Sequence, residues 1–362
     1  MASLRRIRML ANAVRNIMND SEREPLYTIF VEIIRLWFRD RTLPVHYYIY
    51  LLYRRDSSNN VCAYVGLRNI ARVRDRINSP SWTSVLDNKR LFDAYFRPTG
   101  IRLPKILGFN EKNRFVVGDD AVLVRNRERL LDVLKSLVMT SSTNSVFAKP
   151  TGGGCGRGCF MFDLSSICLV CADKGSGIVN GDYIYQEVIV QHPKMAELHP
   201  SSVNTLRIDT YRTDDGEVDV MSAFLRMGAN KSCTDNVSSG GCFVGVDLET
   251  GRLVEKGFVL SQYKPSVLKH HPDTGVTFKD FGVPFFHEAV LIAKQAARLT
   301  PLAVVGWDLA IGPDGPILIE GNAHYDGYLS EMAYGRYYKN PVFRRLIRDH
   351  APSLDKIARQ FD

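Results

Sequence analysis

The sequence lacks the features that mark several classes of protein. Its longest apolar stretches, such as Tyr47–Tyr53, stop well short of the roughly 18 uncharged residues that a membrane-spanning helix needs. The basic N-terminus has no apolar signal-peptide core followed by small residues. Seven cysteines scattered over 362 residues do not suggest a disulfide framework. We therefore expect a cytoplasmic protein with reduced thiols.

Composition and length indicate a folded protein of two or three packed units. Hydrophobic residues make up 45% of the chain and charged residues 24%, which is typical of globular proteins. Neither internal repeats nor low-complexity segments are evident. The formal charge of +8 favours an anionic partner without identifying one.

The N-terminal region, residues 1–85, is expected to be mainly helical and carries no chemical motif. Phe30, Ile33, Ile34 and Trp37 follow the spacing of one helix face. The tyrosines of Tyr47–Tyr53 lie beside a basic segment, but no RNA-binding spacing accompanies them, so we expect no nucleic-acid partner. The amphipathic stretch 26–38 leaves a peripheral membrane contact open, although we do not expect it.

The remaining chain alternates helical and strand patterns, which predicts an α/β (α+β) fold. After a break at Asn78–Trp82, a helix opens near Asp87, and a second is signalled by Leu130, Leu134 and Leu137. The expected strands are Ser145–Pro150, Tyr183–Val190, Thr205–Arg212, Val218–Arg226, Cys242–Asp247, Ala303–Ile311 and Pro316–Glu320. A further helix covers Phe286–Ala297, and Pro341 and Pro352 open two short terminal helices. We predict structural units at 1–85, 86–190 and 191–362.

The strongest chemical signal is a hairpin with acidic residues in an apolar setting. If its loop is Pro313–Gly315, Asp308 lies opposite Glu320, and period-two alternation places Asn322 on the same face. Two carboxylates and an amide oxygen form a donor set suited to Mg²⁺. The alternative is an ordinary hairpin with a polar, solvated face, but the neighbouring valines and isoleucines make unpaired acids costly.

A glycine-rich loop follows the strand that ends at Lys149-Pro150. Its glycines allow backbone N–H groups to approach phosphate oxygens, and Lys149 adds a positive charge. The spacing matches neither a P-loop nor a Rossmann turn, so a flexible surface loop remains the alternative. The glycines are Gly152, Gly153, Gly154, Gly156 and Gly158.

Other polar residues have weaker patterns. Gln186 and Glu187 interrupt an apolar strand and can serve a purine edge or simply end the strand. Cys168 and Cys171 have metal-ligand spacing without a second pair, which favours buried thiols. His270 and His271 precede Pro272 and are expected in an exposed turn.

Taken in order, these segments resemble the ATP-grasp superfamily over roughly residues 85–330. The resemblance comprises an Asp-x-Lys helix followed by Gly-Ile-x-x-Pro, the Lys-Pro strand with its glycine lid, the Gln-Glu pair, and the Asp…Glu-x-Asn hairpin. Asn204–Asp209 and Asp235–Gly241 are similar to segments of the sugar-transfer-associated group. The resemblance implies two α+β subdomains that clasp ATP, and an association with polysaccharide or secondary-metabolite assembly.

The resemblance also implies roles for individual residues. Lys89, Lys149 and the lid glycines would hold the phosphates of ATP, and Gln186, Glu187 and the Val188 backbone would hold adenine. Asp308, Glu320 and Asn322 would hold one or two Mg²⁺ ions. Arg207 and Arg226 would neutralise the transferred phosphoryl group, with a salt bridge to a nearby acid as the alternative. Asn236, Gly240 and Gly241 would shape the acceptor site.

Two enzymatic functions follow from this resemblance. The first is an ATP- and Mg²⁺-dependent ligase that joins a small-molecule carboxylate to an amine through an acyl phosphate. The alternative is a phosphotransferase that acts on a hydroxyl acceptor such as a sugar. A nucleotide-dependent scaffold is a third, non-enzymatic interpretation. Residues 1–85 do not show the βαβ pattern of a usual preceding domain, so the family's substrates cannot be transferred to this chain.

Overall fold

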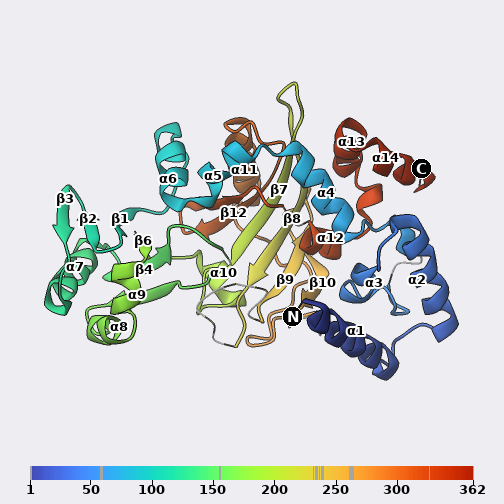
Figure 1. Ribbon diagram of the computed structural model, residues 1–362, viewed down its shortest axis with the longest axis horizontal. Coiled ribbons are helices and arrows are strands. Elements are labelled where there is room, and N and C mark those ends of the chain that lie inside the picture. The colour runs from blue at the N-terminus through green and yellow to red at the C-terminus, as the bar shows by residue number, and fades with distance from the viewer. Residues whose placement is uncertain are drawn as a thin grey trace.

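The computed structural model shows two antiparallel sheets side by side, with helices around them (Figure 1). It describes residues 2–57, 60–154, 156–230, 232, 235, 237, 240–260, 265–325 and 327–361, with side chains from residue 10 onward. Within these residues no helix is both long and apolar enough to span a membrane. The α/β (α+β) architecture expected from the sequence is confirmed.

The smaller sheet has six strands in the order β3-β2-β1-β6-β4-β5. Its strands are β1 (Ile106–Glu111), β2 (Arg114–Val117), β3 (Asp120–Leu123), β4 (Ser145–Pro150), β5 (Phe160–Asp163) and β6 (Asp182–Glu187). Helices α7 (Arg127–Thr140), α8 (Ile167–Asp173) and α9 (Gly175–Asn180) pack against it. Leu130, Leu134 and Leu137 of α7 are buried in its core, as their spacing predicts. The lid glycines lie between β4 and β5.

The larger sheet has seven strands in the order β11-β10-β9-β8-β7-β12-β13. They are β7 (Thr205–Arg212), β8 (Val218–Met227), β9 (Cys242–Val246), β10 (Leu253–Val259), β11 (Ser266–Leu268), β12 (Val304–Gly312) and β13 (Gly315–Asn322). Helices α5 (Pro80–Asp87), α6 (Lys89–Phe96) and α11 (Phe286–Arg298) pack on the face that carries the fully buried Trp307. The short α10 (Pro193–Leu198) precedes β7.

The opposite face of the large sheet packs against both ends of the chain. The N-terminal helices are α1 (Ala2–Asn19), α2 (Leu26–Asp40), α3 (Val45–Ile49) and α4 (Leu67–Ile77), and the C-terminal ones are α12 (Tyr328–Tyr334), α13 (Pro341–His350) and α14 (Pro352–Ala358). Short 3₁₀ turns cover Val61–Ala63, Arg97–Thr99, Tyr337–Lys339 and Arg359–Phe361. The segment Tyr47–Tyr53 is buried against Phe224 and Phe243 of the sheet, so its tyrosines cannot stack on bases.

In the hairpin that carries the predicted acids, the acids pair in the expected register, but the loop that joins the strands differs from the expected one. Asp308 pairs with Glu320 and Gly306 with Asn322. The loop, however, is Pro313-Asp314, one residue shorter than expected, because Gly312 pairs with Gly315. A bulge between Asp308 and Leu309 compensates, since Leu309 pairs with Leu318 and leaves Ile319 as the extra residue.

Three local expectations need correction: the break at Asn78–Trp82 is shorter, the helix cap near Asp87 is one residue off, and the buried face of α2 differs. The sequence break at Asn78–Trp82 contains the start of helix α5, which Pro80 opens at its first position. Asp87 ends this helix, and the N-cap of α6 is Asn88, whose side chain accepts the Arg90 and Leu91 amides. On α2 the buried residues are Ile29, Leu36 and Asp40, whereas Phe30 and Trp37 remain exposed.

Candidate active site

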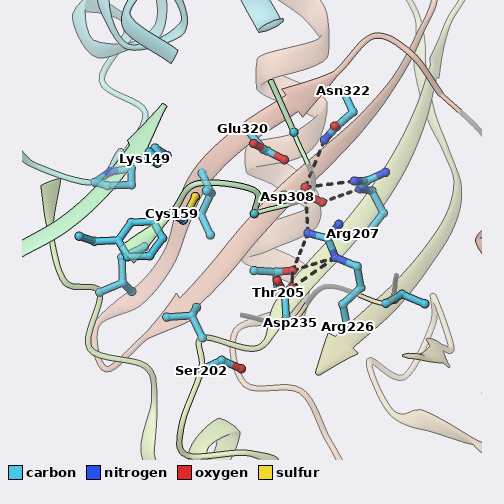
Figure 2. A pocket seen from close by; sticks show the side chains of 18 of the residues that line it. Lys149, Cys159, Ser202, Thr205, Arg207, Arg226, Asp235, Asp308, Glu320 and Asn322 are labelled. Atoms are coloured by element: carbon cyan, nitrogen blue, oxygen red, sulfur yellow. Dashed lines mark hydrogen bonds and ion pairs between the residues drawn. The ribbon is translucent and has the colours of Figure 1, made fainter. Parts of the chain in front are cut away.

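One cavity of about 660 Å³ lies between the two sheets and collects most of the predicted site residues (Figure 2). The small sheet and its loops, together with Lys89 of α6, contribute the groups expected at the nucleotide, and the large sheet contributes the acids and arginines. The predicted residues that line this cavity are Lys89, Lys149, Gly152, Gly153, Gly154, Gly156, Gln186, Glu187, Val188, Arg207, Arg226, Asp308, Glu320 and Asn322.

The acids and one arginine form a row across three adjacent strands. Arg207 of β7 pairs with Asp308 of β12, which pairs with Glu320 of β13. Directly paired residues point to the same face of a sheet, so all three side chains reach the cavity. Arg207 donates two hydrogen bonds to Asp308, with Nε–Oδ1 2.5 Å and Nη2–Oδ2 3.0 Å. Arg226 Nη2 lies 2.9 Å from Asp308 Oδ2.

The two carboxyl groups of this row have pKa values shifted in opposite directions. Burial opposes the charge of Asp308, but Arg207 and Arg226 outweigh it and hold the pKa of Asp308 well below its usual value. Burial and the neighbouring charge of Asp308 instead raise the pKa of Glu320, and Lys149 and Lys89 only partly offset this. The row therefore contains one firmly ionised acid beside one whose charge is disfavoured.

Two lysines also line the cavity, Lys149 at the end of β4 in the smaller sheet and Lys89 at the start of α6. Lys149 is buried at the end of β4, and burial lowers its pKa to about 8 despite the favourable charge of Glu320. Lys89 Nζ donates to the Gly153 carbonyl at 2.8 Å, and the Lys89 amide donates to the Thr151 carbonyl at 2.9 Å. The N-terminus of α6 is thus bonded directly to the lid. Gly153 itself has φ +86°, a conformation that disfavours other residues.

The predicted adenine-binding segment lies at the end of β6. Gln186 and Val188 line the cavity. Glu187 Oε1 accepts hydrogen bonds from Lys105 Nζ at 2.8 Å and from the Ser142 amide at 3.0 Å. Burial opposes the Glu187 charge, but these donors lower its pKa below the usual value. The structure therefore holds Glu187 as an ionised, oriented acceptor.

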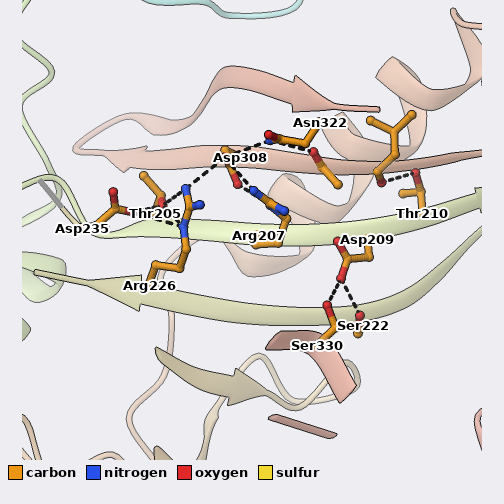
Figure 3. Close-up of polar contacts among 12 residues, drawn as sticks. Thr205, Arg207, Asp209, Thr210, Ser222, Arg226, Asp235, Asp308, Asn322 and Ser330 are labelled. Carbon is orange, nitrogen blue, oxygen red and sulfur yellow. Dashed lines mark hydrogen bonds and ion pairs between the residues drawn. The ribbon is translucent and has the colours of Figure 1, made fainter. Parts of the chain in front are cut away.

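The structure adds two cavity residues that the sequence reasoning missed. Thr205 Oγ1 donates to Asp235, and Arg226 donates to Thr205 Oγ1 from Nε at 3.0 Å and from Nη2 at 2.8 Å (Figure 3). Arg226 Nε also lies 3.3 Å from Asp235. Arg226 thereby joins Asp308 to the loop that follows β8. Asp235 begins the segment singled out by resemblance, which was the only signal that pointed to it.

A glycine makes room for this network. A Cβ at Gly306 would lie 2.9 Å from both Arg207 Nη1 and Asp209 Oδ1. Asp209 is fully buried and accepts hydrogen bonds from Ser222 and Ser330 (Figure 3). Gly306 is therefore needed for the close packing of charged side chains beside Asp308.

Four predicted residues are not brought to the cavity by the described structure. Asn236 lies outside the described residues. Gly158 packs beside Pro150 and Tyr183, and Gly240 and Gly241 are not among the described residues that line the cavity. Their proposed roles in the lid and the acceptor site remain predictions.

The fold and the cavity together define an ATP-grasp protein. The sequence profile described as sugar-transfer associated ATP-grasp matches residues 68–342, about three quarters of the chain. The chain belongs to the sugar-transfer-associated ATP-grasp family. A comparison with curated proteins gives no match.

Solved structures show a more distant likeness. The ATP-grasp ligase PsnB complexed with its minimal precursor shares 14% identity, with 75% of this chain and 64% of that chain covered and a TM-score of 0.41. The ADP complex of purK, N5-carboxyaminoimidazole ribonucleotide synthetase, shares 14% identity, with 74% of this chain and 52% of that chain covered and a TM-score of 0.42. D-alanyl-alanine synthetase A from Vibrio cholerae O1 biovar eltor str. N16961 shares 10% identity, with 78% of this chain and 67% of that chain covered and a TM-score of 0.41. The chain thus spans less than two thirds of the first two relatives, and likenesses this distant carry no argument about activity.

Proposed function

We propose that this protein is an ATP- and Mg²⁺-dependent ligase that joins a carboxylate to an amine through an acyl phosphate. The observation that supports it best is the opposition of Asp308 and Glu320 in a cavity that Lys149 enters from the other sheet. Family membership supports ATP as the phosphoryl donor. The organisation of the site matches the needs of phosphoryl transfer, which depends on positioning and electrostatics rather than on an enzyme nucleophile.

The donor set fits Mg²⁺. Asp308 and Glu320 supply carboxylate oxygens, and Asn322 uses Nδ2 as a donor to Asp308 at 3.1 Å, which leaves its amide oxygen as an acceptor. Burial raises the pKa of Glu320, and the close negative charge of Asp308 adds to this effect, which a divalent cation would relieve. Bound Mg²⁺ would neutralise phosphate charge. Asp308, Glu320 and Asn322 would hold it.

The proposed reaction has two steps. A carboxylate oxygen of the substrate attacks the γ-phosphorus, the bond to the bridging oxygen breaks, and ADP leaves. The amine nitrogen then attacks the acyl carbon, loses a proton, and expels inorganic phosphate as the amide forms. Lys149 and Lys89 are placed to hold phosphate oxygens, and Arg207 and Arg226 carry positive charge to the same cavity.

Isotope tracing tests the ligase against the kinase alternative. The protein is incubated with ATP, Mg²⁺ and carboxylates labelled with ¹⁸O, such as amino acids and uronic acids, with hydroxylamine as the trapping amine. A ligase yields a hydroxamate together with ADP and phosphate that carries one ¹⁸O atom. A stable phosphorylated acceptor with no free phosphate would refute the ligase and support the kinase. Absence of any ATP-dependent product over the panel, with ATP bound, would favour the scaffold interpretation over both enzymes.

A pair of variants on the same hairpin tests the role of Asp308 against the loss of a carboxylate elsewhere. Asp308→Asn should abolish hydroxamate formation. Asp314→Asn removes a carboxylate from the exposed loop, where Asp314 only approaches Arg102 at 3.7 Å, and should leave the reaction unchanged. We also propose, from the family description, that the reaction serves polysaccharide or secondary-metabolite assembly, and, from the sequence, that it takes place in the cytoplasm.

A further inference from the structure

A second cluster of polar side chains lies outside the cavity. It consists of His199, His271 and Asp273, whose candidate ligand atoms all lie within 4.8 Å of one another. His199 directly follows α10, while His271 and Asp273 belong to the turn after β11. The sequence places both His270 and His271 in an exposed turn, but only His270 is exposed. His199 is 2% exposed and His271 is fully buried, so this part of the expectation was wrong.

Backbone carbonyl oxygens orient both imidazole rings. His271 Nε2 lies 2.8 Å from the Gly228 carbonyl oxygen, and His199 Nε2 lies 3.2 Å from that of Ser232. A carbonyl only accepts, so each Nε2 carries a proton, and His271 Nδ1, which accepts the Asp273 amide, presents a lone pair. Histidines that bind metals in proteins have this arrangement, in which one ring N–H is held by a carbonyl and the other nitrogen is the ligand.

The two Nδ1 atoms have different surroundings. His271 Nδ1 accepts a hydrogen bond from the Asp273 amide at 3.2 Å. Within the described part of the chain, no donor reaches the buried His199 Nδ1. The nearest charged group is the Asp273 carboxylate, with Oδ2 at 3.7 Å. A lone pair that faces a carboxylate at this distance is unfavourable unless a proton or a cation lies between them.

We infer that His199 Nδ1, His271 Nδ1 and the Asp273 carboxylate form a binding site for one divalent transition-metal ion of the Zn²⁺ type. Two nitrogen ligands and one carboxylate suit Zn²⁺, whereas Mg²⁺ prefers oxygen donors alone. Tetrahedral Zn²⁺ at about 2.0–2.1 Å from its ligands holds them about 3.3 Å apart, close to the His199–Asp273 distance. Binding replaces the 3.2 Å hydrogen bond at His271 and leaves one coordination position for water.

The metal would tie the turn after β11 to the segment that follows α10, which borders the cavity. His199 immediately precedes Pro200, Ser201, Ser202 and Val203, which line the cavity. The carbonyls that orient the rings belong to the loop after β8, from which Asp235 also reaches the cavity. A Cβ at Gly228 would lie 2.7 Å from His199 Nε2, so the ring packs directly on this loop. The inferred role is structural, and it does not depend on the proposed ligase reaction.

Co²⁺ binding to the full-length protein tests the inference. Purified protein is stripped with a chelator, saturated with Mg²⁺ to occupy sites of oxygen donors, and titrated with Co²⁺ while visible absorption is recorded. We expect one equivalent of Co²⁺ with the intense bands of low-coordinate cobalt, and competition by Zn²⁺. Asp273→Asn should weaken Co²⁺ binding at least about 10-fold, because it removes the anionic ligand at a partly exposed position.

Matched variants separate the site from general effects. His199→Gln should also lose the cobalt bands, whereas His270→Gln removes the adjacent exposed histidine and should retain them. Equal Co²⁺ affinity in the wild type and in Asp273→Asn would overturn the inference. The inference would also be overturned if no cobalt bands appear at micromolar Co²⁺ and an NMR titration shows that His199 gains a proton beside Asp273. A proton would then occupy the place assigned to the metal.

Discussion

The two opposed acids of the hairpin should affect stability in opposite directions, although both should be needed for turnover. Asp308 is 1% exposed and is held by two arginines, whereas the charge of Glu320 is disfavoured by burial and by Asp308. Removal of one partner of a buried ion pair costs about 3–5 kcal/mol. Because Arg226 keeps Asp235 and Thr205 as partners, we expect Asp308→Asn to lower the free energy of unfolding by about 3 kcal/mol at pH 7.

The matched variant Glu320→Gln removes the same charge from the facing position. It should leave the free energy of unfolding at pH 7 unchanged or raise it, because it removes an ionised group that the folded state disfavours. The pH dependence has opposite signs as well. The lowered pKa of Asp308 contributes stability above pH 3.8 that is lost as the pH falls below it. The raised pKa of Glu320 contributes stability at low pH that is lost as the pH rises above 4.5.

Urea unfolding followed by circular dichroism from pH 3 to pH 8 measures both effects, and ATP hydrolysis or ligation measures turnover. We expect Asp308→Asn to fall less than the wild type below pH 3.8, and Glu320→Gln to fall less than the wild type as the pH rises above 4.5. If Glu320→Gln destabilises the protein as much as Asp308→Asn at pH 7, the arginines do not distinguish the two acids and the reasoning fails. Asp314→Asn serves as the control for loss of charge on this hairpin.

Three further predictions concern Lys149, the lid and Glu331. Lys149→Met should weaken ATP binding about 10- to 100-fold in calorimetry and leave adenosine binding unchanged, and equal losses for both ligands would contradict this. In the wild type, ATP affinity should fall above pH 8 as Lys149 loses its proton. Replacement of Gly153 and Gly154 by Val should reduce turnover more than it reduces adenosine affinity. Hydrogen exchange over residues 151–160 should slow with an ATP analogue only in the wild type, and the same protection in the variant would count against a lid. Burial raises the pKa of Glu331 to about 8, so the free energy of unfolding should fall as the pH rises from 4.5 to 8. In Glu331→Gln the side chain still accepts from the Val65 and Tyr337 amides, and urea unfolding should show on the order of 1–3 kcal/mol less of this fall. An unaltered pH profile would refute the raised pKa.

The acid row was predictable because alternation along strands is a strong constraint. Asp308, Glu320 and Asn322 had to share a face once the hairpin was recognised, and the structure pairs Asp308 with Glu320 as expected. The predicted loop was one residue too long. The predicted pairing of Asp308 with Glu320 is still correct because a bulge restores the register. Sequence patterns indicate which residues face together, but they do not reveal a bulge, since its energy depends on packing across the sheet.

Contacts between distant segments could not be predicted from the sequence. Asp235 reaches Thr205 and Arg226 only because the loop after β8 folds back over the sheet. His271 is buried because it packs against His199, which is 72 positions away in the sequence, and the exposed turn expected before Pro272 describes only His270. Helix α2 shows the same limit, since two apolar faces compete on one helix and tertiary packing buries the one with Ile29 and Leu36.

The two interpretations of the strand arginines are compatible in this geometry. A guanidinium group has five N–H donors. Arg207 uses Nε and Nη2 on Asp308, and Arg226 uses the same two nitrogens on Thr205 and Asp308. In both residues these bonds leave donors on Nη1, and both side chains line the cavity. The salt bridges therefore fix the arginines in place while part of each guanidinium stays able to bind a phosphoryl oxygen. A lysine has no such fixed fork, so a single ammonium group could not hold Asp308 in this bidentate geometry and also keep a fixed donor for the phosphoryl group.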